Sequence, residues 1–280
     1  MSDLPWFLSV LTCRHSVMDD DACRDVDPTK LSVAGAYDFS AGGDDNTRTD
    51  RLTVISFEEK WPGIASNAIA NANFLQRVVR FFASHGIHQI LDLGAGKPKA
   101  QAGANVHEIL TQTTGNGQVV YVEKDPTAHA HARAIWGRQP GTGYVEADLA
   151  DTDHVLGSPE VERLINFDQP VGLLMVASLH YILGDVAPVV ARYADVVPAG
   201  SLLAISHMTS DAAPEELLDD IRAVYEPVGG VSIRSTSEIR ALFQGWPLVE
   251  PGLVEVRDWR PEEAVQHGPI GLLGGVARKP

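Results

Sequence analysis

The sequence predicts an α/β protein with a mostly parallel sheet that helices cover on both faces. Three observations support this class. Short apolar or β-branched runs alternate with longer segments of helical periodicity from residue 89 onward. The chain has 280 residues, 44% of them hydrophobic, which is enough to bury a large core. It shows neither an internal repeat nor a low-complexity linker, so one main domain with an N-terminal addition is the simplest organisation.

The predicted strands are short runs rich in apolar or β-branched residues. Five of them lie at residues 89–93, 119–122, 144–147, 171–177 and 201–206. Two more, at 253–258 and 272–278, can pair as a terminal hairpin. A sheet of seven strands is therefore expected.

The predicted helices follow the spacing of apolar residues. Four of them separate the strands, at 106–113, 127–136, 153–165 and 186–197. Upstream, residues 69–83 place Phe74, Val78, Phe81 and Phe82 on one side of a helix. Downstream, helices are predicted at 214–225 and 236–243, and the second is preceded by Ser235 with Glu238 at capping-box spacing.

Composition excludes several classes of partner. The formal net charge is -15 and the pI about 5.0, without a long basic run, so nucleic acid is not expected to bind. The two cysteines, Cys13 and Cys23, do not indicate a disulfide framework. The apolar run at 4–11 follows Asp3 instead of basic residues, which argues against a secretory signal, and no run is long enough to span a bilayer. We expect a cytoplasmic protein that does not bind membranes, and the oligomeric state stays open.

The turn after the first predicted strand reads DLGAG, at residues 92–96. A dinucleotide-binding turn reads G-x-G-x-x-G, and its third glycine lets a helix N-terminus hold a pyrophosphate. Here the third position is Lys99, and Pro98 favours extended geometry before it. The chain should therefore continue as a loop through 97–104 and begin a helix after Asn105, with Glu108 as the capping partner. Such a turn suits a nucleoside without phosphates.

Acidic residues follow the next two strands. Glu123 ends the second strand, where a carboxylate can accept hydrogen bonds from both hydroxyls of a ribose. Its separation from Gly94 exceeds the usual spacing of about 20 residues, and the eight loop residues 97–104 account for the excess. After the third strand, Asp148 can accept from an adenine amino group while Leu149 packs on the ring. Three such elements at strand ends predict a nucleoside site.

The order DLGAG, YVEKDP, EADL and SLHYI resembles the Rossmann-like (class I) S-adenosylmethionine-dependent methyltransferases. More narrowly, AGAYDFSAGGDDN, ANANFLQRVVRFF, DLGAGKP, NVHEIL, VVYVEKDP and ADL together resemble the actinobacterial S-adenosyl methyltransferase family, once catalogued as a domain of unknown function. The similarity runs from about Asp27 to the C-terminus. It implies a Rossmann-like methyltransferase fold, with a seven-stranded, mostly parallel sheet, an antiparallel last strand and S-adenosyl-L-methionine at the strand ends.

Carried over residue by residue, the resemblance implies that Asp92, Gly94 and Gly96 line the methionine half of the cofactor. It places Glu123 at the ribose and Asp148 and Leu149 at the adenine. The complete expected cofactor site is Asp92, Gly94, Ala95, Gly96, Glu123, Lys124, Asp148, Leu149 and Ser178. Asp44 departs from the family, where a basic residue is expected, so a role of its loop in gripping an acidic substrate is in doubt.

The resulting organisation has three parts: an N-terminal tail at 1–26, a helical or lid region at 27–86, and an S-adenosylmethionine-binding Rossmann-like domain at 87–280. The polar, glycine-containing segment at 37–46 is the candidate lid over cofactor or substrate, with a plain loop as the alternative.

Methyl transfer depends mainly on holding the acceptor atom in line with the reactive methyl group. A base is needed only when the acceptor is an alcohol or phenol. The candidates are His180 and His207, which follow strand ends, and Tyr37; for each of them the alternative is a residue bonded within the protein. No metal site is expected, because the partial H-E-x-x-H motif at His107 has Thr111 in its last position.

Three functions remain open. The leading one is O- or N-methylation of a small molecule. The second is a protein that binds S-adenosylmethionine without transferring the methyl group, since sites and not folds define function. The third, a nicotinamide-dependent oxidoreductase, is disfavoured by Pro98 and Lys99.

Overall fold

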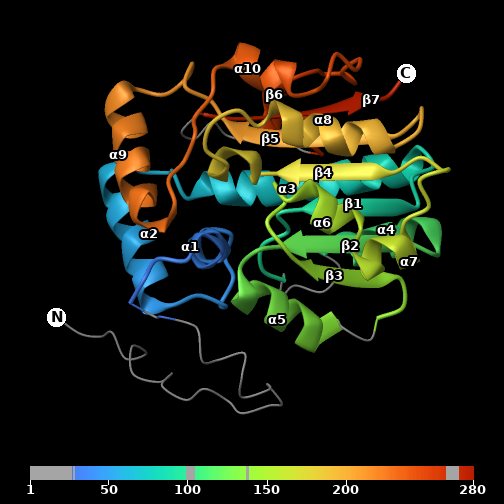
Figure 1. Ribbon diagram of the computed structural model, residues 1–280. Helices are drawn as coiled ribbons and strands as arrows, with labels where there is room; N and C mark the ends of the chain where they lie inside the picture. The colour runs from blue at the N-terminus through green and yellow to red at the C-terminus, as the bar shows by residue number, and fades with distance from the viewer. Residues whose placement is uncertain (1–26, 28, 99–104, 137–138, 263–270) are drawn as a thin grey trace.

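The computed structural model describes residues 27, 29–98, 105–136, 139–262 and 271–280. The predicted tail at 1–26, both cysteines and Lys99 lie outside these residues. A seven-stranded sheet forms the centre, in the order β3-β2-β1-β4-β5-β7-β6 (Figure 1). Its strands are β1 (Gln89–Leu93), β2 (Gln118–Glu123), β3 (Thr142–Glu146), β4 (Gly172–Val176), β5 (Leu202–Met208), β6 (Val254–Glu255) and β7 (Leu272–Arg278).

The directions of the strands determine where a ligand can bind. The strands β1 to β5 are parallel, whereas β7 is antiparallel to both β5 and β6, so the last strand is antiparallel as expected. The carboxyl ends of β1 to β5 therefore meet at one edge. The order of strands reverses between β1 and β4, and open α/β sheets bind ligands outside the strand ends at such a switch point.

Helices cover both faces of the sheet. One face packs against α3 (Ser66–Ser84), α4 (Val106–Thr114) and α5 (Pro126–Trp136), and its core contains Ile90 and Phe82. The other packs against α6 (Thr152–Leu156), α7 (Pro159–Leu164), α8 (Ala187–Val196) and the end of α10 (Thr236–Ala241), and its core contains Leu91 and Leu93. Alternate residues of β1 thus face opposite layers, as the two-residue period of a strand requires.

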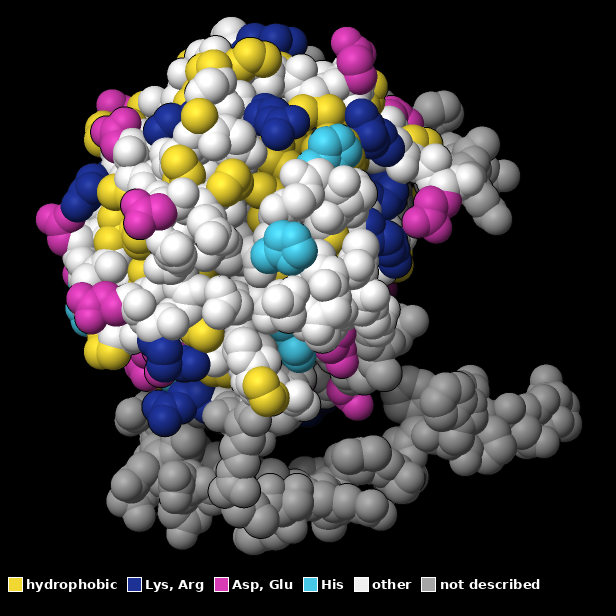
Figure 2. All heavy atoms as spheres, turned by 90° about the vertical axis from the view of Figure 1, so that its right-hand side faces the viewer, with side chains coloured by type: hydrophobic (Ala, Val, Ile, Leu, Met, Phe, Trp, Pro, Cys, Tyr) yellow, Lys and Arg dark blue, Asp and Glu magenta, His cyan; other side chains and the backbone are white. Residues whose placement is uncertain are grey.

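Three more α-helices and two 3-10 helices lie at the carboxyl edge of the sheet (Figure 1). They are α1 (Val33–Ser40), α2 (Arg48–Lys60) and α9 (Glu215–Tyr225), together with the 3-10 helices η1 (Leu179–Tyr181) and η2 (Glu226–Val228). Figure 2 shows the face at the amino ends of the parallel strands, where basic and acidic side chains are interspersed. Within the described chain, no helix combines the length and apolar character needed to cross a bilayer.

Two local predictions were wrong. The helix expected at 153–165 is two helices, because Ser158 caps α7 and Pro159 occupies its first turn. The strand expected at 253–258 pairs only at Val254–Glu255 and then continues as the 3-10 helix η3 (Val256–Asp258). The capping boxes predicted at Asn105 and Ser235 are both confirmed.

The N-terminal helices are joined by one buried carboxylate. Asp50 is 0% exposed and accepts hydrogen bonds from the backbone N–H groups of Ser32 and Thr47, both at 2.8 Å. Ser32 in turn caps α1 and donates its hydroxyl to Asp125, which follows β2, at 3.1 Å. Asp50 therefore sets the position of α1 and α2 above the edge of the sheet.

Replacing this carboxylate should loosen the N-terminal helices. We expect Asp50→Ala to lower the free energy of unfolding by about 2–4 kcal/mol, because buried N–H groups lose a charged acceptor. The exposed Glu59 on the same helix offers a control, and Glu59→Ala should stay within about 0.5 kcal/mol of wild type. Urea unfolding measures both, and equal midpoints for the two variants would contradict this role.

Candidate functional site

A cavity of about 690 Å³ opens at the carboxyl edge of the sheet. The turns after β1, β2, β3 and β4 form one side of it, and residues of α1, α3 and the segment 228–230 form the other. The nine residues expected to hold the cofactor all line this cavity: Asp92, Gly94, Ala95, Gly96, Glu123, Lys124, Asp148, Leu149 and Ser178. The structure therefore brings together side chains that lie as far as 86 residues apart in the sequence.

The turn after β1 requires glycine for two different reasons. Gly94 has φ +86°, and a Cβ at this position would lie 2.4 Å from the Cβ of Ser178. Gly96 has φ +65°, and a Cβ there would meet nothing within 4 Å. Both glycines have a positive φ that L side chains rarely adopt, and Gly94 in addition leaves room for the side chain of Ser178, whereas open space lies beside Gly96. A ligand can thus approach the backbone closely.

Glu123 joins the ends of β1 and β2. Its Oε2 accepts a hydrogen bond from the N–H of Gly96 at 2.7 Å, and its Oε1 accepts from the N–H groups of Lys124 and Asp125, both at 2.9 Å. Burial raises the pKa of the carboxyl, although the backbone hydrogen bonds oppose this shift. The carboxylate is held in one orientation, with unused lone pairs available to hydroxyl donors.

The third strand contributes a second carboxylate. Asp148 accepts from the N–H of Ala150 at 2.9 Å and lies 3.3 Å from the Nζ of Lys124. The next residue, Leu149, is buried and presents an apolar side chain. Beside Leu149, the buried Oγ of Ser178 has no hydrogen-bond partner among the described residues. This set offers an acceptor, an apolar surface and an unused hydroxyl to a ligand.

Lys97 explains why the turn departs from a phosphate-binding sequence. The side chain is buried, and its Nζ donates to the backbone oxygen of Asp45 at 2.8 Å and lies 3.4 Å from Oδ1 of the same residue. His131 bonds the other carboxylate oxygen of Asp45. Burial acts to raise the pKa of Asp45, but His131 and Lys97 together lower it. Lys97 thus anchors the segment 41–46 to the turn after β1.

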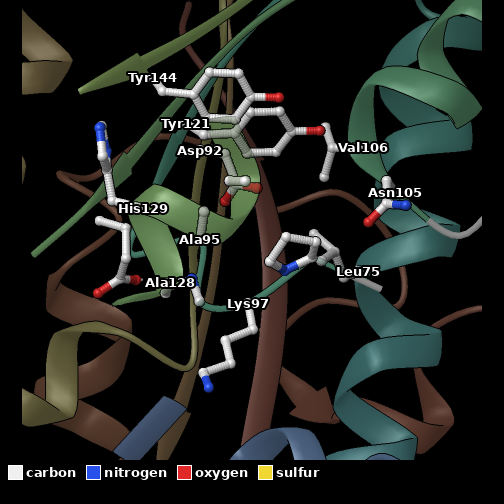
Figure 3. A pocket seen from close by; sticks show the side chains of 14 residues that line it. Leu75, Asp92, Ala95, Lys97, Asn105, Val106, Tyr121, Ala128, His129 and Tyr144 are labelled. Atoms are coloured by element: carbon white, nitrogen blue, oxygen red, sulfur yellow. Dashed lines mark hydrogen bonds between the residues drawn. The ribbon is translucent and has the colours of Figure 1, made fainter. Parts of the chain in front are cut away.

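A small cavity of about 30 Å³ lies on the other side of this turn. Tyr121 and Tyr144 stack above Asp92, with ring centroids 5.4 Å apart, and Figure 3 shows Lys97 pointing away from them. The Tyr121 hydroxyl bonds the N–H and Nδ1 of His107 at 3.0 and 2.8 Å. This packing supports the turn after β1 on the side of the small cavity.

The candidate lid segment 37–46 forms a wall of the large cavity. Asp38 is 4% exposed, and its Oδ2 accepts from the N–H of Asp45 and the amide of Asn46, both at 2.9 Å. A Cβ on Gly43 would lie 2.1 Å from the Asp38 carboxylate. The first part of the segment, up to Ser40, belongs to α1, and the glycine and the acidic residues that follow shape a compact loop at 41–46.

Tyr37 lies on the boundary between the large cavity and a second one of about 160 Å³. Its hydroxyl accepts from the amide of Asn71 at 2.8 Å and donates to the backbone oxygen of Ala68 at 3.3 Å. Burial raises the pKa of Tyr37 to about 12. The phenol is neutral at ordinary pH and is suited to donate a hydrogen bond more than to remove a proton.

His180 lies on η1 and lines the second cavity. The side chain is 1% exposed, and its Nδ1 has no hydrogen-bond partner among the described residues. Burial lowers the pKa of His180 well below its usual value, and the neighbouring His207 and Arg234 add to this effect. The imidazole is therefore neutral and able to accept a hydrogen bond. Its neighbour Tyr181 lines both cavities.

The structure does not bring His207 to either of the two larger cavities. The residue lies within β5, which extends to Met208, and not after it as the sequence suggested. Its Nδ1 donates to the backbone oxygen of Met208 at 2.7 Å, and its Nε2 accepts from Arg234, also at 2.7 Å. Burial lowers the pKa of His207 to about 4. His207 is therefore a histidine bonded within the protein, which was the alternative interpretation of this residue.

Arg234 is a residue that the sequence did not single out. Besides His207, its guanidinium donates to the backbone oxygens of Leu179, Ile182 and Gly184 at 3.3, 3.3 and 2.7 Å. It thereby holds the segment that contains His180 and Tyr181 against β5. A single arginine in a polar loop carries no local pattern that predicts such contacts. Among the described residues, no cluster of His, Cys, Asp and Glu could hold a metal ion.

Comparisons with known proteins agree with this geometry. A family model described as S-adenosyl methyltransferase matches residues 19–280. The crystal structure of a candidate methyltransferase from Thermobifida fusca YX is 35% identical, with 90% of this chain and 96% of that chain covered and a TM-score of 0.84. A DUF574 family protein from Streptomyces avermitilis MA-4680 is 31% identical, with coverages of 91% and 99% and a TM-score of 0.84. Among proteins with curated descriptions, none matches.

The energetic cost of a Cβ that collides with Ser178 at position 94 can be measured separately from the cost of the backbone conformation there. Gly86 has φ +80° and open space where a Cβ would lie, so Gly86→Ala carries only the backbone cost. Gly94→Ala adds the collision with Ser178, and we expect it to lower the free energy of unfolding by about 1–3 kcal/mol more than Gly86→Ala. Urea unfolding of both variants checks this difference. Equal decreases in the free energy of unfolding would mean that the turn accommodates the added Cβ without strain.

Proposed function

Because the chain belongs to the S-adenosyl methyltransferase family, we propose that it methylates an oxygen or nitrogen atom of a small molecule. Family membership makes it an S-adenosylmethionine-dependent methyltransferase, and its sheet has the seven-stranded order described above. The observation that supports the proposal most strongly is the meeting of nine expected residues, from four strand ends, around one cavity.

We assign the large cavity to S-adenosyl-L-methionine. Its volume of about 690 Å³ lies within the usual range of small-molecule sites, roughly 300–1,000 Å³. Asp92, Glu123 and Asp148 line it, and these carboxylates suit a cofactor that carries a sulfonium and an ammonium group. The open space beside Gly96 and the unused hydroxyl of Ser178 are further features that a bound ligand would fill.

Each part of the cofactor has a proposed partner. Glu123 would accept from the ribose hydroxyls, because its two oxygens are already oriented by backbone N–H groups. Asp148 would accept from the adenine amino group, with Leu149 and Lys124 beside it. The turn Gly94, Ala95 and Gly96, with Asp92, would hold the methionine half.

The cofactor supplies a methyl group on a sulfonium sulfur, and the bonding electrons stay on sulfur when the methyl group leaves. The protein then has to align the acceptor and, for a hydroxyl, to receive its proton. We propose His180 for this role, because it lines the second cavity and its Nδ1 has no partner in the described part of the chain. Tyr37 would contact the acceptor from the boundary between the two cavities, with its hydroxyl bonded to Asn71 and Ala68. His207 is not proposed as a base, because both of its ring nitrogens are bonded.

We further propose that residues 27–86 act as the cover of the cofactor cavity. Residues of α1 and α3 line it, and the bonds of Lys97 and His131 to Asp45 hold the segment 41–46 in place. This region would exclude water from the methyl group.

Binding of S-adenosylhomocysteine, measured by calorimetry, tests the cofactor assignment. We expect micromolar affinity for the wild type and a loss of about tenfold or more in Glu123→Ala and in Asp148→Ala, as for removed charged acceptors. Glu162 is exposed on α7 and does not line the cavity, so Glu162→Ala should bind as the wild type does. Absent binding in the wild type, or equal affinity in all variants, would contradict the assignment.

The affinity should also depend on pH through Glu123. An ordinary glutamate has a pKa of about 4.3. The pKa of Glu123 is raised, so its protonation begins at a higher pH. A protonated carboxyl accepts fewer hydrogen bonds. The affinity for S-adenosylhomocysteine should therefore be highest above the pKa of Glu123 and fall as the pH decreases through that pKa. Titrations between about pH 8 and about pH 5 measure this, with Glu123→Gln expected to show a much weaker dependence. An unchanged dependence in Glu123→Gln would assign the effect to another group.

A further inference from the structure

The second cavity lies beside the proposed cofactor site and shares a boundary with it. Its volume is about 160 Å³, and it is lined by α1, α2, α9, η1 and the end of β5. Four residues line both cavities: Leu31, Tyr37, Ala177 and Tyr181. A molecule in the second cavity would therefore lie next to a cofactor bound in the large one.

The linings of the two cavities differ in charge. Asp38, Asp92, Glu123, Lys124 and Asp148 line the large one. Among the described residues that line the second one, there is no aspartate, glutamate, lysine or arginine. Its walls are mainly apolar, with Val54 and Phe57 from α2 and Leu217, Leu218 and Ile221 from α9. Because an unpaired charge is costly to bury, this lining favours an uncharged molecule.

The boundary carries flat side chains. Tyr181 packs against Tyr225 with ring centroids 5.4 Å apart, and against His180 with centroids 4.4 Å apart. Both partners line the second cavity. A void of roughly 150 Å³ with apolar walls accommodates benzene in another protein, so the present volume suits one aromatic ring with a small substituent.

A polar group in such a molecule would find few partners here. His180 is the lining residue with a buried nitrogen that lacks a partner among the described residues. Arg234 holds the backbone of this segment through Leu179, Ile182 and Gly184, so the position of His180 is well defined. The cavity is also lined by the amide of Asn67 and by three hydroxyls that are bonded within the protein, those of Ser40, Thr53 and Thr209. One hydroxyl or amine near His180, on an otherwise apolar ring, matches this arrangement.

We infer that the second cavity binds the methyl acceptor, and that the acceptor is an uncharged molecule about the size of one aromatic ring, such as a simple phenol. This inference rests on the proposed function, because it assigns the neighbouring large cavity to the cofactor. On methylation of a hydroxyl, the oxygen forms its bond to the methyl carbon as the carbon–sulfur bond breaks. The sulfur keeps that electron pair, and the hydroxyl proton passes to the imidazole of His180.

Binding of three ring probes to protein saturated with S-adenosylhomocysteine tests the inference. The probes are phenol, benzoate and benzylammonium, which are similar in size and differ in charge. Saturation-transfer NMR titrations should show phenol binding at least about tenfold more tightly than either ion, because the cavity offers no counter-charge. Comparable affinities for phenol and benzoate would overturn the inference.

Two substitutions at Val54 locate the binding. Val54 lines only the second cavity, whereas Ile55, the next residue on α2, is 44% exposed and lines neither. Val54→Trp should fill the cavity and weaken phenol binding about tenfold or more, while Ile55→Trp leaves it unchanged. Val54→Asp should raise the affinity for benzylammonium relative to phenol, and Ile55→Asp should not.

The affinity for S-adenosylhomocysteine separates the possible failures. All four variants should bind it within about twofold of the wild type, which shows that they are folded and that the large cavity is intact. No binding of S-adenosylhomocysteine to the wild type would overturn the proposed function and this inference with it. Normal binding of S-adenosylhomocysteine, with phenol affected equally by Val54→Trp and Ile55→Trp, would overturn the acceptor cavity alone.

Discussion

The carboxylate of Glu123 is the interaction on which the site depends. It accepts hydrogen bonds from the backbone of Gly96, Lys124 and Asp125, and so ties the turn after β1 to the end of β2. Parallel strands place their carboxyl ends side by side, but they do not determine the shape of the turns that follow. A buried carboxylate with several N–H donors determines it here, and the contact of Gly94 with Ser178 then brings the turn after β4 against the same point. The large cavity lies between these turns.

Two basic residues place the surrounding walls, each through partners distant in sequence. Lys97 bonds Asp45, 52 residues away, and holds the segment 41–46 beside the turn after β1. Arg234 bonds His207 and three backbone oxygens, and holds η1 beside β5. Neither is free to bind an anion, which agrees with a site for a nucleoside without phosphates. In both cases a buried cation positions backbone, because it has several N–H donors: Lys97 bonds the carbonyl and the carboxylate of Asp45, and Arg234 bonds three carbonyl groups.

The two adjoining cavities differ in the charge of the side chains that line them. Carboxylates line the larger one, which suits a cationic cofactor, and uncharged side chains line the smaller one. Tyr37 and Tyr181 stand where the two meet, so this boundary is where a methyl group would pass from one ligand to the other. The residues that build the smaller cavity come largely from α1, α2 and α9, outside the strand ends. Of these helices, α2 and α9 do not line the larger cavity, so differences in them would change the smaller cavity without altering the lining of the larger one.

The sequence by itself determined the α/β class, the strands and the helices that cover the sheet, and nine of the residues that line the large cavity, but not α1 and α2. It could do so because local periodicity defines strands and helices, and because parallel strands bring Gly94, Glu123, Asp148 and Ser178 to one edge whatever else packs around them. It could not determine that His207 lies inside β5, since the end of a strand depends on its pairing with β7. Only the tertiary structure decided the contacts of Lys97 and Arg234 and the uncharged second cavity. These contacts and this cavity are formed by side chains from segments that are distant in the sequence. No pattern of residue spacing along the chain predicts them.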